Sequence, residues 1–197
     1  MDPVPADVRA VMRRLEGLDA RDREDGTARE RRLRAVRPEV GEFLMTLVLA
    51  TGARMVVELG TSGGYSTLWL AVGLSRTGGR VTTFEIDPAK VELASRSFAD
   101  AGVDGTVDLR HQDAAEGLRA LEPGSADLVF LDAEKEDYER FLTLSVTALR
   151  QGGLLVADNL TSHREDLQGF RDAALSHPEL AGLVVPIGRG ELVAVRA

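Results

Sequence analysis

The chain has 197 residues and a net charge of −8, which fits a globular protein large enough to bury a sizeable core. The acidic balance argues against a nucleic-acid partner, because phosphates require a basic face. Cysteine is absent, which excludes disulfides and thiol chemistry, and no segment approaches the roughly 20 apolar residues of a membrane span. We therefore expect a soluble, cytoplasmic protein with neither a nucleic-acid nor a membrane partner.

Residues 1–36 are charge-dense and are expected to form an N-terminal helical segment ahead of a domain over residues 37–197. Apolar residues recur there at helical spacing and predict an amphipathic helix: Val8, Val11, Met12 and Leu15. Residues 19–26 are expected to be a loop or a frayed helix. The arginine cluster at 29–34 could be an anion site, but interleaved Glu30 and an acidic chain favour a solvated helix face.

The remainder of the chain alternates between helical and strand patterns. The predicted helices are 38–50, 65–74, 88–101, 135–149 and 164–176. The predicted strands are 55–59, 80–86, 106–110, 127–132, 154–158, 181–186 and 191–196. This alternation predicts an α/β fold with a mostly parallel, seven-stranded sheet and helices on both faces. No helix separates the last two strands, so the last strand should be antiparallel.

A glycine-rich turn follows the first predicted strand. Gly60, Gly63 and Gly64 lie between an apolar strand and a helix beginning near Tyr65, and Glu58 lies at the strand end. A strand–glycine turn–helix unit commonly holds a nucleotide-like cofactor. The spacing differs from the Gly-x-Gly-x-x-Gly dinucleotide fingerprint, and a nearby carboxylate would repel a pyrophosphate. The turn favours S-adenosylmethionine, which has a cationic group and free hydroxyls; a sugar or phosphate site is the alternative.

Acidic residues stand at the ends of the predicted strands, where open α/β sheets bind ligands. These strand-end positions are Glu58, Glu85, Asp113, Asp132 and the pair Asp158-Asn159. Any single one could simply cap the next helix, and Asp113 and nearby Asp87 are good candidates for that role. Glu85 is placed to accept hydrogen bonds from ribose hydroxyls. The set as a whole predicts a ligand site at this edge of the sheet.

A hard-cation site is expected where the fourth and fifth strands end. Asp132, Asp158 and Asn159 offer two carboxylates and an amide oxygen. Mg²⁺ prefers about six oxygen ligands and is usually held by few protein groups plus substrate and water. Mn²⁺ or Ca²⁺ could compete on ligand type alone. The sequence therefore predicts a divalent cation bound between protein and substrate oxygens.

Lys135 follows Asp132 by three residues and is one of only two lysines, the other being Lys90. A lysine at a helix start is electrostatically disfavoured. Unlike arginine, lysine can release its proton when burial and a nearby cation lower its pKa. This position favours a general base; the alternative is a surface ion pair with Glu134 or Glu136. Nearby His163 has no metal-ligand spacing, and exposure in a loop is its simpler interpretation.

Taken together, these motifs resemble the cation-dependent O-methyltransferases, the group of catechol and caffeoyl-CoA O-methyltransferases with many bacterial members. The resemblance spans about Arg37 to the C-terminus and rests on five stretches: Val57–Ser66, Phe84–Pro88, Gln112-Asp113, Asp132–Tyr138 and Ala157–Asn159. It implies a Rossmann-like class I S-adenosylmethionine-dependent methyltransferase fold.

The resemblance also implies roles for individual residues. Asp132, Asp158 and Asn159 would bind the metal, and Lys135 would take the proton. The cofactor would be held by Val36, Glu58, Gly60, Ser62, Gly64, Ser66, Glu85, Gln112, Asp113 and Asp132. The chain lacks the long insertion after Asn159 that closes the acceptor pocket in the plant enzymes.

The expected activity is methyl transfer from S-adenosylmethionine, assisted by Mg²⁺ or another divalent cation, to a hydroxyl of a small vicinal dihydroxy-aromatic. A homodimer is an assembly that we leave open. Two other functions also stay open at this point. One is a non-catalytic S-adenosylmethionine-binding module, and the other is a nucleotide-cofactor oxidoreductase, which the absent dinucleotide fingerprint disfavours.

Overall fold

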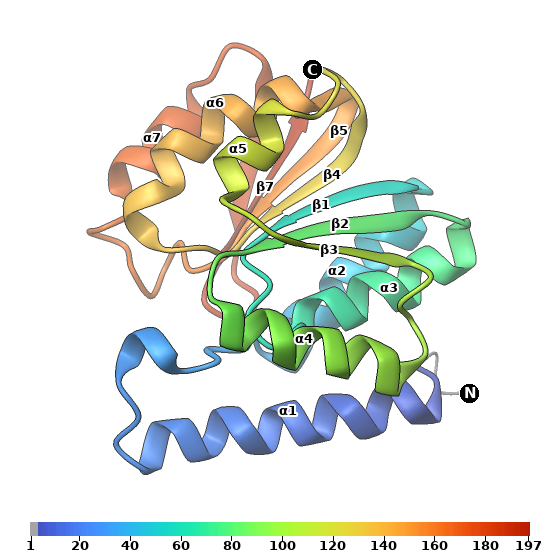
Figure 1. Cartoon of the computed structure of the whole chain (residues 1–197). Coiled ribbons are helices and arrows are strands. Elements are labelled where there is room, and N and C mark those ends of the chain that lie inside the picture. Colours follow the sequence, from blue (N-terminus) through green and yellow to red (C-terminus); the bar gives the residue numbers. More distant parts are fainter. Residues whose placement is uncertain (1–3) are drawn as a thin grey trace.

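A computed structural model of the protein describes residues 4–197 as a sheet with helices on both faces (Figure 1). The seven strands lie in the order β3-β2-β1-β4-β5-β7-β6. Their bounds are β1 Met55–Leu59, β2 Arg80–Glu85, β3 Val107–His111, β4 Ala126–Leu131, β5 Leu149–Ala157, β6 Leu180–Val185 and β7 Glu191–Arg196. Strand β7 is antiparallel to its neighbours, which confirms the predicted antiparallel last strand, and it inserts between β5 and β6, which was not predicted.

The helices divide between the two faces of the sheet (Figure 1). Their bounds are α1 Ala6–Glu24, α2 Pro38–Thr51, α3 Tyr65–Thr77, α4 Pro88–Ala101, α5 Ala114–Arg119, α6 Tyr138–Ala148 and α7 Gln168–Leu175, with short 3₁₀ turns η1 Arg29–Arg31 and η2 Lys135–Asp137. Side chains from α1 to α4 pack into one apolar core, and those from α5 to α7 pack into a second. Alternate strand residues supply the two cores, as Val56 and Val57 of β1 do.

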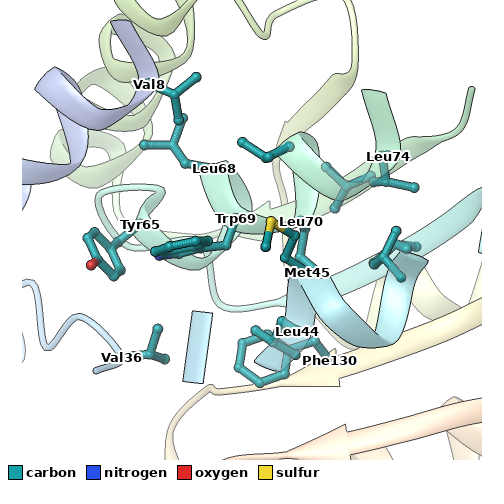
Figure 2. Close-up of a cluster of buried hydrophobic side chains, with 14 of the residues drawn as sticks. Val8, Val36, Leu44, Met45, Tyr65, Leu68, Trp69, Leu70, Leu74 and Phe130 are labelled. Carbon is teal, nitrogen blue, oxygen red and sulfur yellow. The ribbon is translucent and has the colours of Figure 1, made fainter. Parts of the chain in front are cut away.

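The first of these cores joins the N-terminal helices to the sheet. Figure 2 shows Trp69 and Leu70 of α3 beside Met45 of α2. A side chain at Gly41 of α2 would come within 2.1 Å of the Trp69 ring, so the two helices approach each other only because position 41 is glycine. Helix α1 packs against α4 and so forms an outer layer beneath this core (Figure 1).

Several element boundaries differ from the sequence prediction, and helix α5 was not predicted. Residues 19–24 were expected to be a loop or frayed helix, but they complete α1. Asp19 forms an i,i+4 ion pair with Arg23, which supports this last turn. Helix α7 begins at Gln168 rather than 164, and the predicted helix from Lys135 begins as the 3₁₀ turn η2. Strand β5 starts at Leu149, but its regular pairing with β4 runs from Leu154.

The division of the chain at residue 36 stays a prediction, and residues 1–3 of that segment lie outside the described residues. Within residues 4–197, no helix is long and apolar enough to cross a membrane.

Candidate active site

A cavity of about 700 Å³ opens at the carboxyl ends of the strands. Its wall combines the glycine turn, the ends of β2, β4 and β5, the segment before α2, and the turn before β7. Most of the residues that the sequence singled out lie on this wall: Val36, Gly60, Ser62, Ser66, Glu85, Gln112, Asp113, Asp132, Lys135, Asp158 and Asn159. The fold thus brings positions from six separate segments to one site.

Gly60 is required by the sheet itself. Its φ of +98° lies in the left-handed region, and a Cβ there would come within 2.4 Å of the Asp132 carbonyl oxygen. The Gly60 N–H donates to the Phe84 carbonyl at 3.2 Å. The end of β1 is therefore packed directly against the end of β4, and any side chain at position 60 would push the cofactor turn and the acid cluster apart.

Two expected cofactor residues, Glu58 and Gly64, lie behind the cavity wall. A Cβ at Gly64 would come within 2.5 Å of the Phe98 ring, so this glycine is needed for packing against α4. Glu58 is fully buried and accepts hydrogen bonds from Ser66, Thr67 and Thr83. Burial raises the pKa of Glu58 to about 7, although the three hydroxyls oppose the shift. Ser66, which does line the cavity, links Glu58 to that space.

At the end of β2, Glu85 organises the backbone around the turn. Its carboxylate accepts from the N–H of Ser62 at 2.8 Å, Ile86 at 2.9 Å and Asp87 at 3.0 Å. Three lone-pair positions are thereby used, and a carboxylate offers about four. Glu85 therefore holds the turn in place and can still accept one further hydrogen bond from a ligand.

The two aspartates that were considered as helix caps do act as caps. The Asp87 side chain accepts from the N–H of Ala89 at the start of α4, and the Asp113 side chain accepts from that of Glu116 in α5. Asp113 also forms an ion pair with Arg140 at 2.8 Å. Its Oδ1 serves both contacts, which leaves Oδ2 free for a ligand beside Gln112 on the cavity wall.

The predicted acid cluster is assembled where β4 and β5 end side by side. These strands pair in parallel, with Leu131 opposite Ala157, which brings Asp132 next to Asp158 and Asn159. Asn159 Nδ2 donates to Asp132 Oδ1 at 2.9 Å. Burial and the Asp132 charge raise the pKa of Asp158. The two carboxylates thus lie close enough to repel each other, which makes the place electrostatically receptive to a cation.

Lys135 lies against this cluster and is not a surface lysine. Its side chain is only 10 % exposed. Its Nζ lies 3.4 Å from Asp132 Oδ1, and it donates to the Ala133 carbonyl at 3.0 Å and the Tyr138 hydroxyl at 2.9 Å. Glu134 pairs instead with Arg34. The surface ion pair with Glu134 or Glu136 considered from the sequence is therefore wrong, because Lys135 turns into the cavity and pairs with Asp132.

Sequence reasoning missed two buried groups next to this cluster. Tyr138 is completely buried and supports Lys135 through its hydroxyl. Glu191 is also completely buried, and both of its carboxyl oxygens lack a conventional donor. Burial and the neighbouring Asp158 and Asp132 raise the pKa of Glu191, so its carboxyl holds a proton that can be shared with Asp158. Only the register of β7, with Leu192 opposite Ala157, places Glu191 beside Asp158.

The arginine-rich segment before α2 forms one side of the cavity. The expected solvated helix face holds only for η1, where Arg29 and Arg31 are exposed, because Arg32 and Arg34 lie beyond the helical turn and are half-buried against the cavity. Two backbone hydrogen bonds of Leu33 hold the segment in place. The Leu33 N–H donates to the Asp22 carboxylate of α1, and the Leu33 carbonyl accepts from the Ser62 hydroxyl. These contacts place the segment over the glycine turn.

Among residues 4–197, no group of three or more histidine, cysteine, aspartate or glutamate side chains is arranged to hold a metal ion. The expected metal site is a different set, with two aspartates and one asparagine.

Comparisons with known proteins bear on this geometry. A family model described as O-methyltransferase matches residues 21–168. A protein of Mycolicibacterium vanbaalenii whose name places it among the O-methyltransferases is 36 % identical over 95 % of this chain and 90 % of its own length.

Solved structures agree with this match. An O-methyltransferase from Bacillus cereus in complex with SAH is 26 % identical, with a TM-score of 0.81 over 98 % of this chain and 93 % of that one. The O-methyltransferase TomG from Streptomyces achromogenes, in complex with SAM, is 26 % identical, with a TM-score of 0.76 over 93 % and 89 %. The expected class I methyltransferase fold is thus confirmed, and this chain belongs to the O-methyltransferase family of methyl-transferring enzymes.

Proposed function

We propose that this enzyme methylates one hydroxyl of a small vicinal dihydroxy-aromatic, using S-adenosylmethionine and a divalent cation. The observation that carries the proposal is the position of Lys135. Its amine lies 3.4 Å from Asp132, and both residues line the same cavity as Asp158 and Asn159. A proton acceptor and a set of hard oxygen ligands therefore meet at one ligand-accessible place.

The cofactor half of the proposal rests on the glycine turn and on two relatives. The Bacillus cereus enzyme was crystallised with SAH and TomG with SAM, and both are similar to this chain along nearly its whole length. S-Adenosylmethionine would supply the methyl group from a sulfonium centre. The backbone around Gly60 and Ser62 would face the methionine end, and Glu85 and Gln112 are placed for the nucleoside.

The donor set at the ends of β4 and β5 fits a hard cation. Asp132 and Asp158 supply carboxylate oxygens, and a half-turn of the Asn159 amide would replace its Nδ2 with its Oδ1 beside Asp132. Asn159 has a φ of +75°, a conformation that asparagine tolerates better than most residues. A Mg²⁺, Mn²⁺ or Ca²⁺ ion bound here would lower the pKa of an acceptor hydroxyl and orient it.

Within this site, Lys135 would receive the hydroxyl proton on Nζ. The protonated amine has three hydrogens, and three acceptors surround it, so it is held in a fixed position. The Tyr138 hydroxyl can donate in turn to the Asp158 carbonyl at 3.2 Å. This arrangement orients the amine toward the cavity, and such positioning contributes much of the acceleration in a methyl transfer.

The test measures methyl transfer to a panel of catechols before and after removal of metal. We expect activity to be lost in chelator and restored by Mg²⁺. Asp158→Ala should be inactive yet still bind S-adenosylhomocysteine in calorimetry, because the glycine turn is separate from the acid cluster. Asp172→Ala, at an exposed position on α7, is the matched control. Full activity of verified metal-free protein would exclude the metal mechanism.

A further inference from the structure

A group of basic side chains lies on the cavity wall near Lys135. Arg29 comes from η1, His163 follows the Asn159 loop, and Arg189 comes from the turn between β6 and β7. Arg29 is more than 130 residues from His163 and Arg189 in the sequence, yet all three line one cavity with the proposed base. The candidate site does not use them for cofactor, metal or proton transfer.

The backbone fixes this basic group relative to the acid cluster. The N–H of Thr161 donates to the Arg189 carbonyl at 2.8 Å, and the N–H of Leu160 donates to the Gly190 carbonyl at 2.9 Å. The His163 N–H donates to the Asn159 carbonyl at 3.1 Å. The turn that presents Arg189 is thus bonded to the same loop that presents Asn159.

Arg29 and Arg189 differ from two other cavity arginines in their ion pairs. Two other cavity arginines form ion pairs, Arg23 with Asp19 and Arg34 with Glu134, and Arg32 donates to the Thr27 carbonyl. Among the described side chains, neither Arg29 nor Arg189 has an acid within ion-pair distance.

The pKa of His163 is affected by the same basic side chains. Burial and the positive charges of Lys135, Arg29 and Arg189 lower its pKa, and Asp166 opposes them. Arg29 and Arg189 therefore both lie near His163, with the exposed Asp166 carboxylate beside them.

We propose that the methyl acceptor carries a carboxylate in addition to its reacting hydroxyls, and that Arg189 and Arg29 bind this group. The guanidinium fork matches a carboxylate with two parallel hydrogen bonds. The hydroxyls would face the acid cluster and its cation, and the carboxylate would face the basic group. The inference rests on the proposed function and narrows its substrate class from catechols to dihydroxy-aromatic acids.

The experiment compares 3,4-dihydroxybenzoate with its methyl ester, which has the same diol but no charge. Dissociation constants are measured by calorimetry with S-adenosylhomocysteine and Mg²⁺ present, and turnover is measured separately. We expect the acid to bind at least about tenfold more tightly than the ester, as for a charge-assisted contact. In Arg189→Gln and in Arg29→Gln this ratio should fall toward one. The exposed neighbours Arg164 and Arg31, each changed to glutamine, are matched controls. These variants should keep the wild-type ratio of the two dissociation constants.

The outcomes separate the two proposals. An equal affinity for acid and ester, or a preference that survives both arginine substitutions, would overturn the carboxylate site even if catechols are methylated. A preference lost in Arg189→Gln without any turnover of either compound would support the carboxylate site and count against the proposed function. If neither compound binds, the carboxylate site is refuted, and the catechol panel alone decides the proposed function.

Discussion

The two halves of the cavity are built in different ways. The cofactor half is held by backbone groups from the ends of β1 and β2, and a single carboxylate, Glu85, accepts three of their N–H groups. The acceptor half is assembled from charged side chains on distant segments, as the pairing of Arg34 with Glu134 across 100 residues illustrates. The cofactor half is thus built from backbone at the sheet edge, whereas the acceptor half combines acids at strand ends with side chains from the surrounding loops.

This difference has a consequence for substrate choice. Changes in the cofactor half disturb the packing of the sheet, because a Cβ at Gly60 would meet the backbone of Asp132. Arg29 and Arg189 project from a 3₁₀ turn and a loop that can vary without altering the strands. We therefore expect substitutions in the acceptor half to alter selectivity and rate, and those in the cofactor half to alter affinity for the cofactor and stability together.

The largest effect is expected in the acceptor half, for Lys135→Arg. Arginine keeps the charge but cannot accept a proton, so kcat should fall by roughly 10²–10⁴-fold, the usual range for a positioned acid–base group. Affinity for S-adenosylhomocysteine should hardly change. Steady-state kinetics against pH should show a rising limb for the wild type that the variant lacks. Lys90→Arg, at the only other lysine, is the control, and a wild-type rate in Lys135→Arg would refute the base role.

A smaller effect is expected in the cofactor half, for Glu85→Gln. An amide has one acceptor oxygen and its nitrogen faces N–H donors, so at least one charge-assisted hydrogen bond is lost, at about 1.5–3 kcal/mol. Affinity for S-adenosylhomocysteine should fall about 10- to 100-fold in calorimetry. Glu92→Gln, at an exposed residue of α4 that pairs with Arg96, is the control. Unchanged affinity in Glu85→Gln would show that the ligand does not depend on this turn.

The smallest effect is expected for Glu191→Gln, and it is a change in how the free energy of unfolding depends on pH. The pKa of Glu191 is raised in the folded protein, so the folded state keeps a proton that the unfolded chain releases above about pH 4.5. The wild type should therefore lose stability as pH rises, by up to about 1.4 kcal/mol per unit. Glutamine retains a donor toward Asp158 and does not ionise. The stability of the variant relative to the wild type should therefore increase from pH 5 to 7.

Urea unfolding in chelator at pH 5, 6 and 7 measures this gain. Glu136→Gln, at an exposed glutamate in η2, should show none. A stability difference for Glu191→Gln that does not vary with pH would mean that the carboxyl is ionised in the folded protein.

Much of the site could be predicted because it is encoded by short motifs. Strand patterns placed Asp132 and Asp158 at the ends of two strands, and parallel pairing of β4 with β5 brought them together as expected. Glu58 and Gly64 show the limit of such reasoning. Both belong to the expected motif, but only packing against Phe98 and the three surrounding hydroxyls reveals that they lie behind the wall.

By itself, the sequence determined the order of the elements apart from α5, the antiparallel last strand and the positions of the acids and Lys135, because these depend on local periodicity and on groups at strand ends. The tertiary structure alone decided that β7 places Glu191 beside Asp158, and that Arg29 and Arg189 line one cavity. These juxtapositions join segments that no short-range pattern links. They arise from the register of a sheet and the packing of loops, which only the folded chain as a whole determines.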